Sequence, residues 1–294
     1  MNADLRATAA RWLAAAEPGV VIEVVKTAGS VPREAGTRML VSATQAAGTI
    51  GGGHLELMAI ANARALLAKL PDFEAVDRHY PLGPALGQCC GGAVTLRFAR
   101  LQAQSPAQWP AAAPRLFLQL YGAGHVGRAI VRLLAGIPCQ VQWIDERESE
   151  FPVDETLPPH VQCVCVDQVE AEVDLAPPGA CYLVLTHRHD LDLRIAEAIL
   201  RRGDFGYLGM IGSKTKRARF LHRYGERGIA AETLARMTCP IGVAGIEGKE
   251  PEVIAIAVVA QLLQLPLPAA GHALVETHGT APLRNRGTCC SCKG

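Results

Sequence analysis

The sequence feature that most constrains the fold is a glycine-rich turn between an apolar strand and an amphipathic helix. Residues 115–121 are mostly apolar and lead directly into Gly122-x-Gly124-x-x-Gly127, where His125 follows the second glycine. A helical pattern of apolar residues begins at once. Glycines at this spacing allow a tight turn, let the backbone approach a phosphate and let the helix pack closely on the strand. The pattern therefore predicts a Rossmann-like domain.

The strand after that helix supplies the second part of the same pattern. Residues 140–144 are strand-like and end in Asp145, close to the usual distance of about 20 residues beyond the glycines. Its carboxylate is expected where a ribose hydroxyl would bind, and the N-terminus of the preceding helix offers N–H groups to an anion. These features predict a nucleotide-sized, phosphorylated ligand. The alternative is a Rossmann-like domain whose nucleotide site is unused.

Length and composition limit the class of protein. At 294 residues the chain is long enough for two domains, and 49% apolar with 19% charged residues is typical of a compact soluble protein. The net charge of +1 gives no reason to expect nucleic acid or a membrane surface as a partner. No apolar run reaches the roughly 20 residues that a spanning helix needs. Because the first residues do not resemble a signal peptide either, we expect a cytoplasmic protein.

Proline and glycine divide the chain. Residues 102–114 contain three prolines and no apolar period, which predicts a linker. We therefore expect a small α/β domain over 1–101, a Rossmann-like parallel-sheet domain over 115–265 and an irregular, cysteine-containing tail over 266–294. The expected helices of the two domains cover 4–17, 55–70 and 251–263, and the expected strands cover 20–27, 37–41, 75–80, 93–98, 116–121, 140–144, 161–166, 181–185 and 207–210.

A second glycine cluster lies in the first domain. Gly51, Gly52 and Gly53 directly precede a predicted helix, so their N–H groups could turn toward one anion. Arg33, after a proline in an earlier loop, could face this cluster. The alternative is a tight strand–helix turn with no ligand.

A third candidate follows the predicted strand that ends at Met210. Ser213 is a credible helix N-cap, and Lys214 begins a run of basic residues in the first turn of the helix. Positive charge there opposes the helix dipole, which an anion bound at the turn would relieve. The alternative is a solvated basic face.

Two histidines follow the predicted strand 181–185. His187 and His189, with Asp190 and Asp192 close behind, lie at the strand end where open α/β sheets bind ligands. The spacing differs from the HxHxDH zinc motif because no histidine follows Asp192. Polar lining of a ligand cleft, a metal site and a structural turn are all open interpretations.

The ten cysteines are distributed unevenly, and six of them lie in two kinds of surroundings. Cys89 and Cys90 lie between glycines and could act as soft metal ligands, a sulfur acceptor or a redox pair, or remain two ordinary thiols. By contrast, four others lie in or beside apolar strand-like runs, where a free cysteine is usually a small core residue: Cys139, Cys163, Cys165 and Cys181.

Taken together, these segments resemble the XdhC/CoxI family of accessory proteins of molybdenum hydroxylases. The resemblance covers about residues 20–265 in order. The matching elements are Gly29-Ser-x-Pro-Arg33 with Gly36, Gly48-Thr-Ile-Gly-Gly-Gly53 with Leu55-Glu56, Gln88-Cys-Cys-Gly-Gly92, the Gly122–Gly127 turn, Thr186-His-x-His189 with Asp192, Gly212-Ser-Lys-x-Lys-Arg217, and Pro240-Ile-Gly242 before Pro251-Glu252.

The resemblance implies a chaperone rather than an enzyme. Such a protein binds molybdenum cofactor (molybdopterin), protects it during sulfuration and delivers it to apo-xanthine dehydrogenase or a related hydroxylase, with a cysteine desulfurase as sulfur donor. It also implies a homodimer. The residues that would bind the cofactor are Arg33, Gly51, Gly52, Gly53, Gly122, Gly124, His125, Gly127, Asp145, His187, His189, Ser213 and Lys214, with Cys89 and Cys90 as candidate soft ligands of its metal. The alternative function is an NAD(P)-dependent oxidoreductase whose substrate site includes His187 and His189.

Overall fold

The computed structural model describes residues 5–69, 73–83, 91–105, 109, 114–153 and 156–266. The chain divides between Ala111 and Ala112 into two units, and this division lies inside the interval 102–114. The predictions made for Cys89, Cys90 and the tail from residue 267 concern residues outside the described ranges.

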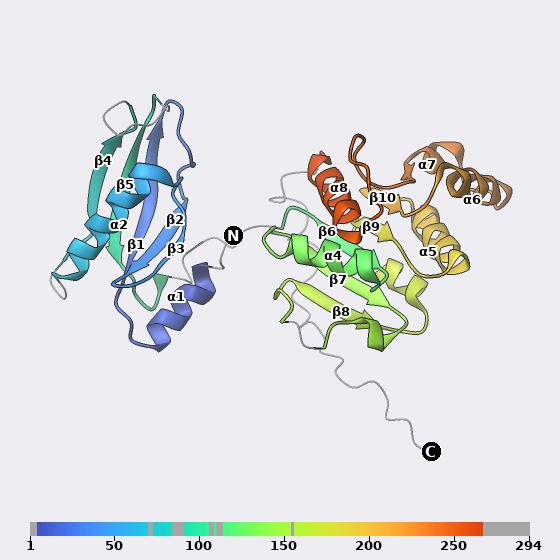
Figure 1. Ribbon diagram of the computed structural model, residues 1–294, viewed down its shortest axis with the longest axis horizontal. Coiled ribbons are helices and arrows are strands. Elements are labelled where there is room, and N and C mark those ends of the chain that lie inside the picture. The colour runs from blue at the N-terminus through green and yellow to red at the C-terminus, as the bar shows by residue number, and fades with distance from the viewer. Residues whose placement is uncertain are drawn as a thin grey trace, which may run out of the picture. The chain divides into compact units, whose positions relative to one another are not determined.

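The first unit is built on an antiparallel five-stranded sheet (Figure 1). The strand order is β3-β2-β1-β5-β4, so the long first strand lies at the centre and pairs with two neighbours. The small α/β first domain that the sequence predicts is thus present. Its elements are α1 (Leu5–Ala14), β1 (Gly19–Ala28), β2 (Arg38–Ser42), β3 (Ala46–Gly48), α2 (Gly53–Leu67), β4 (Val76–Pro81) and β5 (Ala93–Arg100).

The two helices of this unit cover opposite faces of the sheet. Side chains alternate along a strand, so Ile22 on β1 packs in the cluster that contains Leu55 of α2. The next-door Val21 points the other way, into a cluster with Trp12 of α1. The unit therefore has a buried core on each face of one sheet.

The second unit contains a six-stranded parallel sheet in the order β11-β10-β9-β6-β7-β8. The chain starts at β6, moves outward through β7 and β8, and returns to the other side of β6 with β9, which is the Rossmann strand order. The predicted Rossmann-like fold is confirmed. Its elements are β6 (Phe117–Tyr121), α4 (His125–Leu134), β7 (Gln140–Asp145), η2 (Glu148–Glu150), β8 (Val161–Cys165), η3 (Val169–Leu175), β9 (Cys181–Val184), α5 (His189–Arg202), β10 (Tyr207–Met210), α6 (Lys214–Glu226), α7 (Ala231–Ala235), β11 (Met237–Thr238) and α8 (Pro251–Gln264).

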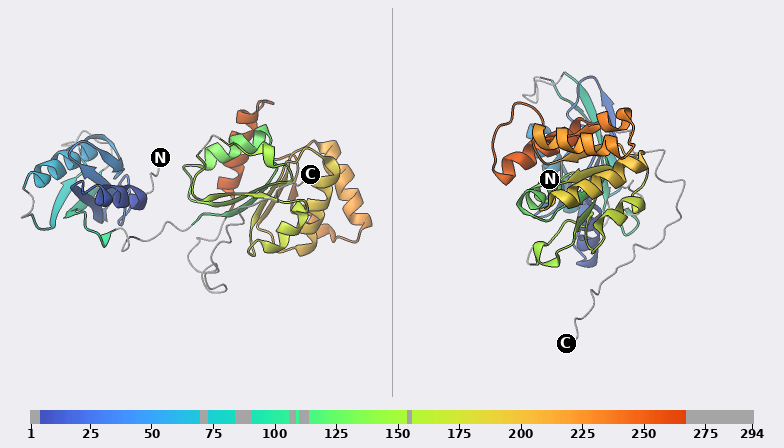
Figure 2. Two further views of the ribbon diagram at one scale, coloured as in Figure 1. Left: turned by 90° about the horizontal axis from the view of Figure 1, so that it is seen from below. Right: turned by 90° about the vertical axis from the view of Figure 1, so that its right-hand side faces the viewer.

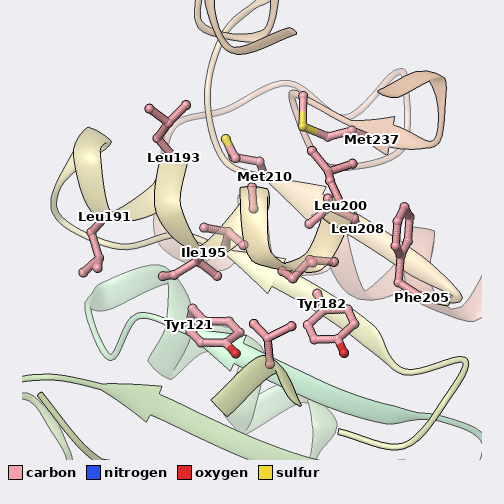
Figure 3. Close-up of a cluster of buried hydrophobic side chains, with 14 of the residues drawn as sticks. Tyr121, Tyr182, Leu191, Leu193, Ile195, Leu200, Phe205, Leu208, Met210 and Met237 are labelled. Carbon is pink, nitrogen blue, oxygen red and sulfur yellow. The ribbon is translucent and has the colours of Figure 1, made fainter. Parts of the chain in front are cut away.

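Helices cover both faces of this sheet. α4 and α8 pack on one face, where Leu118, Leu120 and Trp143 are buried. α5 and α6 pack on the other (Figure 2). On that second face Tyr121 and Tyr182, from the neighbouring strands β6 and β9, lie beneath α5 (Figure 3). The strands are thus buried on both sides, as their nearly continuous apolar sequences predict.

The structure corrects one prediction about the cysteines. Cys139 and Cys181 are buried, as expected of small core residues. Cys163 is exposed and Cys165 is half-buried, because both lie on the edge strand β8, whose central residues face solvent. The sequence pattern thus predicted strand β8 correctly but did not predict which of its residues face solvent.

The last helix, α8, is apolar on nearly every side, and only part of it is buried. Ala255, Val258 and Leu262 pack in the core that also contains Ile130 of α4, whereas Ile256 and Leu263 are exposed. Among the described residues, no helix combines the length and the apolar character that crossing a membrane would require.

Candidate functional site

The candidate site of the second unit lies at the point where the strand order reverses. The loops after β6 and β9 meet there: a Cβ added at Gly122, where φ is +119°, would lie 2.4 Å from the carbonyl oxygen of Leu185. A Cβ at Gly127 would lie 2.2 Å from the carbonyl oxygen of Gly122. These two glycines are therefore needed for close packing of the loops and of α4.

Gly124 has a different role. It is the N-cap of α4 with φ of −70°, and no side chain caps the helix. A Cβ added at Gly124 would meet no heavy atom within 4 Å. The exposed His125 begins the helix. This turn thus leaves open space in front of a helix N-terminus, where free N–H groups and the helix dipole favour an anion.

Asp145 lies at the end of β7, where the sequence places it, but its carboxylate is already engaged. The side chain is only 3% exposed. Oδ2 accepts the N–H of Ala123 at 2.7 Å and Nη2 of Arg147 at 3.1 Å. Oδ1 accepts the backbone N–H and Nε of Arg147, each at 3.0 Å. Burial opposes the charged form, yet the bonds from Arg147 and Ala123 outweigh it and lower the pKa of Asp145.

Four donors fill the usual capacity of a carboxylate. A ribose hydroxyl would therefore have to displace Arg147 before it could bind Asp145. Sequence reasoning missed Arg147, although a basic residue two positions after the expected acidic residue is a signal that could have identified it. Through its bonds to Ala123 and Arg147, Asp145 fixes the glycine turn to the end of β7.

The segment after β9 is held by a second buried carboxylate. Asp192, 1% exposed, accepts the backbone N–H of Thr186 at 3.1 Å and its hydroxyl at 2.7 Å through Oδ1. Its Oδ2 accepts Nζ of Lys216 at 2.7 Å. These bonds fix the loop that carries the two histidines, so the structural-turn interpretation accounts for Thr186 and Asp192.

The histidines themselves lie at the surface of this loop. His187 Nε2 is 3.6 Å from Oε1 of Glu146, the residue after β7. His189 begins α5, and its side chain is 83% exposed. Within the described ranges, no group of three or more His, Cys, Asp or Glu residues could hold a metal ion. Both histidines are thus available as polar lining at this edge of the sheet.

The basic turn after β10 forms as the sequence predicts. Ser213 is the N-cap of α6, and its hydroxyl accepts the N–H of Lys216 at 3.1 Å. Lys214 is exposed in the first turn. Cys239, whose importance the sequence did not indicate, lies behind the turn with Sγ 3.9 Å from the carbonyl oxygen of Ser213, and burial raises the pKa of its thiol.

In the first unit the glycine cluster is occupied by the chain itself. Oε2 of Glu56 accepts the N–H of Gly52 at 3.0 Å, the N–H of Ile50 at 3.2 Å and the hydroxyl of Thr49 at 2.7 Å. The N–H of Gly51 donates to the Thr49 hydroxyl at 3.1 Å. The expectation that Gly51 and Gly52 offer free N–H groups is therefore wrong, because a carboxylate from the helix that follows already takes this place.

These glycines also allow loops to pack together. A Cβ at Gly51 would lie 2.5 Å from Cγ of Pro32 and 3.8 Å from Cγ of Arg33, so Arg33 lies beside the cluster as expected. A Cβ at Gly92 would lie 2.3 Å from the carbonyl oxygen of Ser30. Three glycine-containing segments thus converge in this unit, and the third follows Cys90 in the sequence.

The chain matches two family models. The model of the XdhC Rossmann domain matches residues 118–262, and the model of the XdhC and CoxI family matches residues 12–74. The uncharacterized protein YqeB of Escherichia coli (strain K12) is 29% identical over 284 residues, which cover 90% of this chain and 49% of that protein. The chain therefore spans about half the length of this curated relative.

A solved structure has the same arrangement of elements. The crystal structure of a Bacillus halodurans protein described as a xanthine dehydrogenase superposes with a TM-score of 0.69 at 19% identity. The match covers 89% of this chain and 94% of that one. At this identity the likeness shows that the two proteins share a fold.

Proposed function

The chain belongs to the XdhC and CoxI family, and on that premise we propose that it binds molybdenum cofactor, protects it during sulfuration and delivers it to an apo-xanthine dehydrogenase or a related molybdenum hydroxylase. The partners in this proposal are that hydroxylase and a cysteine desulfurase, and the working form is a cytoplasmic homodimer. The protein acts as a carrier and performs no chemical step of its own.

One observation in the structure supports this ligand independently of the family match. The turn at Gly124 is open and uncapped, whereas the carboxylate of Asp145, which a nucleotide ribose would need, is filled by Ala123 and Arg147. This combination suits a phosphorylated ligand without a ribose better than it suits NAD. Molybdopterin in its mononuclear form has a phosphate and no ribose.

The residues present fit such a ligand chemically. The Gly122–Gly127 turn would hold the phosphate, and His125, His187 and His189 would line the space around the anionic metal dithiolene. In the first unit Arg33 lies beside Gly51, and Gly92, which follows Cys89 and Cys90 in the sequence, packs against the loop at Ser30. The thiolates of Cys89 and Cys90 are soft ligands of the kind molybdenum accepts. When bound, the cofactor would supply the sulfur-containing centre that the hydroxylase needs, and this chain would bind and orient it.

An NAD(P)-dependent oxidoreductase remains the second candidate, because the strand order is that of dinucleotide-binding domains. In that function Arg147 would face a 2′-phosphate, and His187 or His189 would act as the general acid or base. The saturated Asp145 argues against NAD itself.

Metal analysis and an ultraviolet–visible spectrum of protein purified from a molybdenum-replete host test the proposal. We expect substoichiometric to stoichiometric molybdenum with the absorption of the pterin dithiolene. The apoprotein should then take up cofactor in titration and show little affinity for NAD or NADP. Tight binding of either dinucleotide by an apoprotein that takes up no cofactor would contradict the proposed carrier function and support the oxidoreductase function.

A further inference from the structure

A groove in the second unit lies between the first turn of α5 and the outer face of α6. It has a volume of about 510 Å³, which is within the range of small-molecule sites, about 300–1,000 Å³. Its lining includes His189 and Asp190 from α5 and Lys216, Arg219 and Arg223 from α6. Three cationic side chains of α6 therefore face one concave space, together with a histidine and an aspartate of α5.

The cation nearest the base of the groove is fixed in position. Nζ of Lys216 donates to Oδ2 of Asp192 at 2.7 Å and to the carbonyl oxygen of Ile211 at 2.8 Å, and lies 5.5 Å from the centre of the Phe220 ring. Its side chain is only 10% exposed. Lys216 is thus an ordered wall of the groove rather than a mobile surface lysine.

The two arginines of the groove are not neutralised. Arg219 and Arg223 are one helical turn apart, a spacing at which like charges repel. Neither makes a hydrogen bond or an ion pair to any residue that the structure describes. By contrast, Arg201 and Arg202 of α5 and Arg227 after α6 each pair with a carboxylate. Two arginine charges in the groove thus have no carboxylate partner among the described residues.

Acidic groups do little to cancel this charge. Asp190 is the acidic residue of the lining, and it lies 3.7 Å from Nε of Arg188 on the far side of the turn. Asp192 is buried behind Lys216 and holds that lysine. Arg219, Arg223 and, when protonated, His189 therefore set the sign of the potential in the groove.

We propose that this groove is an anion site that binds the phosphate or diphosphate group of a small phosphorylated molecule. Two arginines with planar forks and a fixed lysine are the donors that phosphate oxygens prefer. The lining of the groove comes from α5, from α6 and from residues 212–213 just before α6, and it shares His189 with the lining proposed for the cofactor. The phosphate contacts proposed here are those of Arg219 and Arg223, which the cofactor proposal does not use.

Calorimetric titration of the full chain with inorganic pyrophosphate tests the proposal. We expect one binding event that weakens as salt is raised. Arg219→Ala and Arg223→Ala should each weaken it by about tenfold, since each removes a charge-assisted contact. Arg219→Lys should restore part of the affinity because it restores the charge without the fork.

Arg217→Ala is the matched control, since Arg217 is on the same helix and carries the same charge but does not line the groove. It should change the affinity less than about twofold, an effect of long-range charge only. Equal weakening by all three alanine variants would show a diffuse basic surface in place of a site, and no binding by the wild type would overturn the proposal outright. Loss of cofactor uptake with pyrophosphate binding intact would count against the proposed function alone.

Discussion

The glycine turns of the two units look alike in sequence but differ in what occupies their N–H groups. In the first unit Glu56, from the first turns of the helix that follows, accepts the N–H groups of Ile50 and Gly52. In the second unit Asp145 comes from the next strand and takes only the N–H of Ala123. The N-cap glycines of the two helices, Gly52 and Gly124, are alike in having no side-chain cap and no atom within 4 Å of an added Cβ. The turn before α2 is thus held by a carboxylate of its own helix through two N–H groups, whereas the turn before α4 is held by a carboxylate from a neighbouring strand through one.

Glycines before a helix therefore do not by themselves indicate an anion site. A carboxylate a few residues into the helix can reach back to the turn and take the place of the anion, as Glu56 does. In the second unit the corresponding position, Arg128, is basic and donates instead to Glu150. The residue four positions after the turn is therefore what distinguishes the two.

The largest effect should come from the glycine that packs two loops together. Gly122→Ala places a methyl group 2.4 Å from the carbonyl oxygen of Leu185 at a φ of +119°, so we expect a loss of about 2–4 kcal/mol in the free energy of unfolding of the second unit. Gly124→Ala should cost about 1 kcal/mol or less, because its Cβ meets no atom within 4 Å and the loss is that of a good N-cap. Hydrogen exchange in urea, followed on peptides of the second unit, measures both. Equal losses would mean that the two glycines are not distinct in role.

Asp145→Asn should have the next largest effect, about 2 kcal/mol at neutral pH, reduced from the value for a fully buried pair because Arg147 is one-third exposed. Since the folded pKa of Asp145 is lowered, its contribution is complete above the unfolded pKa of about 4 and is lost as the pH falls through the folded value. Wild-type unfolding measured from pH 7 to pH 2 should therefore lose more stability below pH 4 than the Asn variant does. Parallel curves would show that Asp145 is not ionised in the folded protein, where it accepts bonds from Ala123 and Arg147.

Glu56→Gln tests whether the carboxylate holds the glycine turn of the first unit. The amide keeps one acceptor but loses the charge that faces three donors, so we expect about 1.5 kcal/mol of destabilisation, confined to the first unit. Hydrogen exchange at Ile50 and Gly52 should rise in the same variant. Unchanged protection there would mean that the carboxylate does not close the turn.

The smallest changes in the free energy of unfolding should come from substitution of two cysteines of the second unit. Cys181→Ala should lower the stability of the second unit by about 1 kcal/mol because the thiol is buried in the sheet. Cys163→Ala, at an exposed edge position, should change it by less than about 0.5 kcal/mol. Matching losses, measured by urea unfolding, would place Cys163 in the core after all.

Most of the fold could be predicted because it depends on local patterns. Apolar runs ending at Tyr121, Asp145 and Met210 gave the parallel strands, and the glycine spacing gave the Rossmann turn. The short strands β3 and β11 were missed because three- and two-residue segments carry no period. The exposed face of β8 was missed because edge position is a property of the sheet, not of the segment.

The sites were predicted less completely because they depend on side chains that meet across the fold. Ser213 could be identified as a cap from its neighbours, whereas the bond between Lys216 and Asp192 joins residues from two helices. Glu56 and Arg147 are close in sequence to the glycine turn and the aspartate that they satisfy, so counting the donors and acceptors of each turn would have identified both.

If the open turn of the second unit holds the phosphate end of the ligand, Gly124→Val should lower cofactor retention. The Cβ of the valine meets no heavy atom within 4 Å, so the branched side chain enters the open space before α4. Gly136→Val is the matched control, because a Cβ at Gly136, in the α4–β7 connection, also meets no atom within 4 Å. We expect both the molybdenum content and the amount of cofactor delivered to an apo-hydroxylase to fall at least about tenfold in Gly124→Val, because the charged phosphate loses its hydrogen bonds. Both quantities should stay at the wild-type level in Gly136→Val. Full retention by a folded Gly124→Val protein would show that the turn does not hold the phosphate.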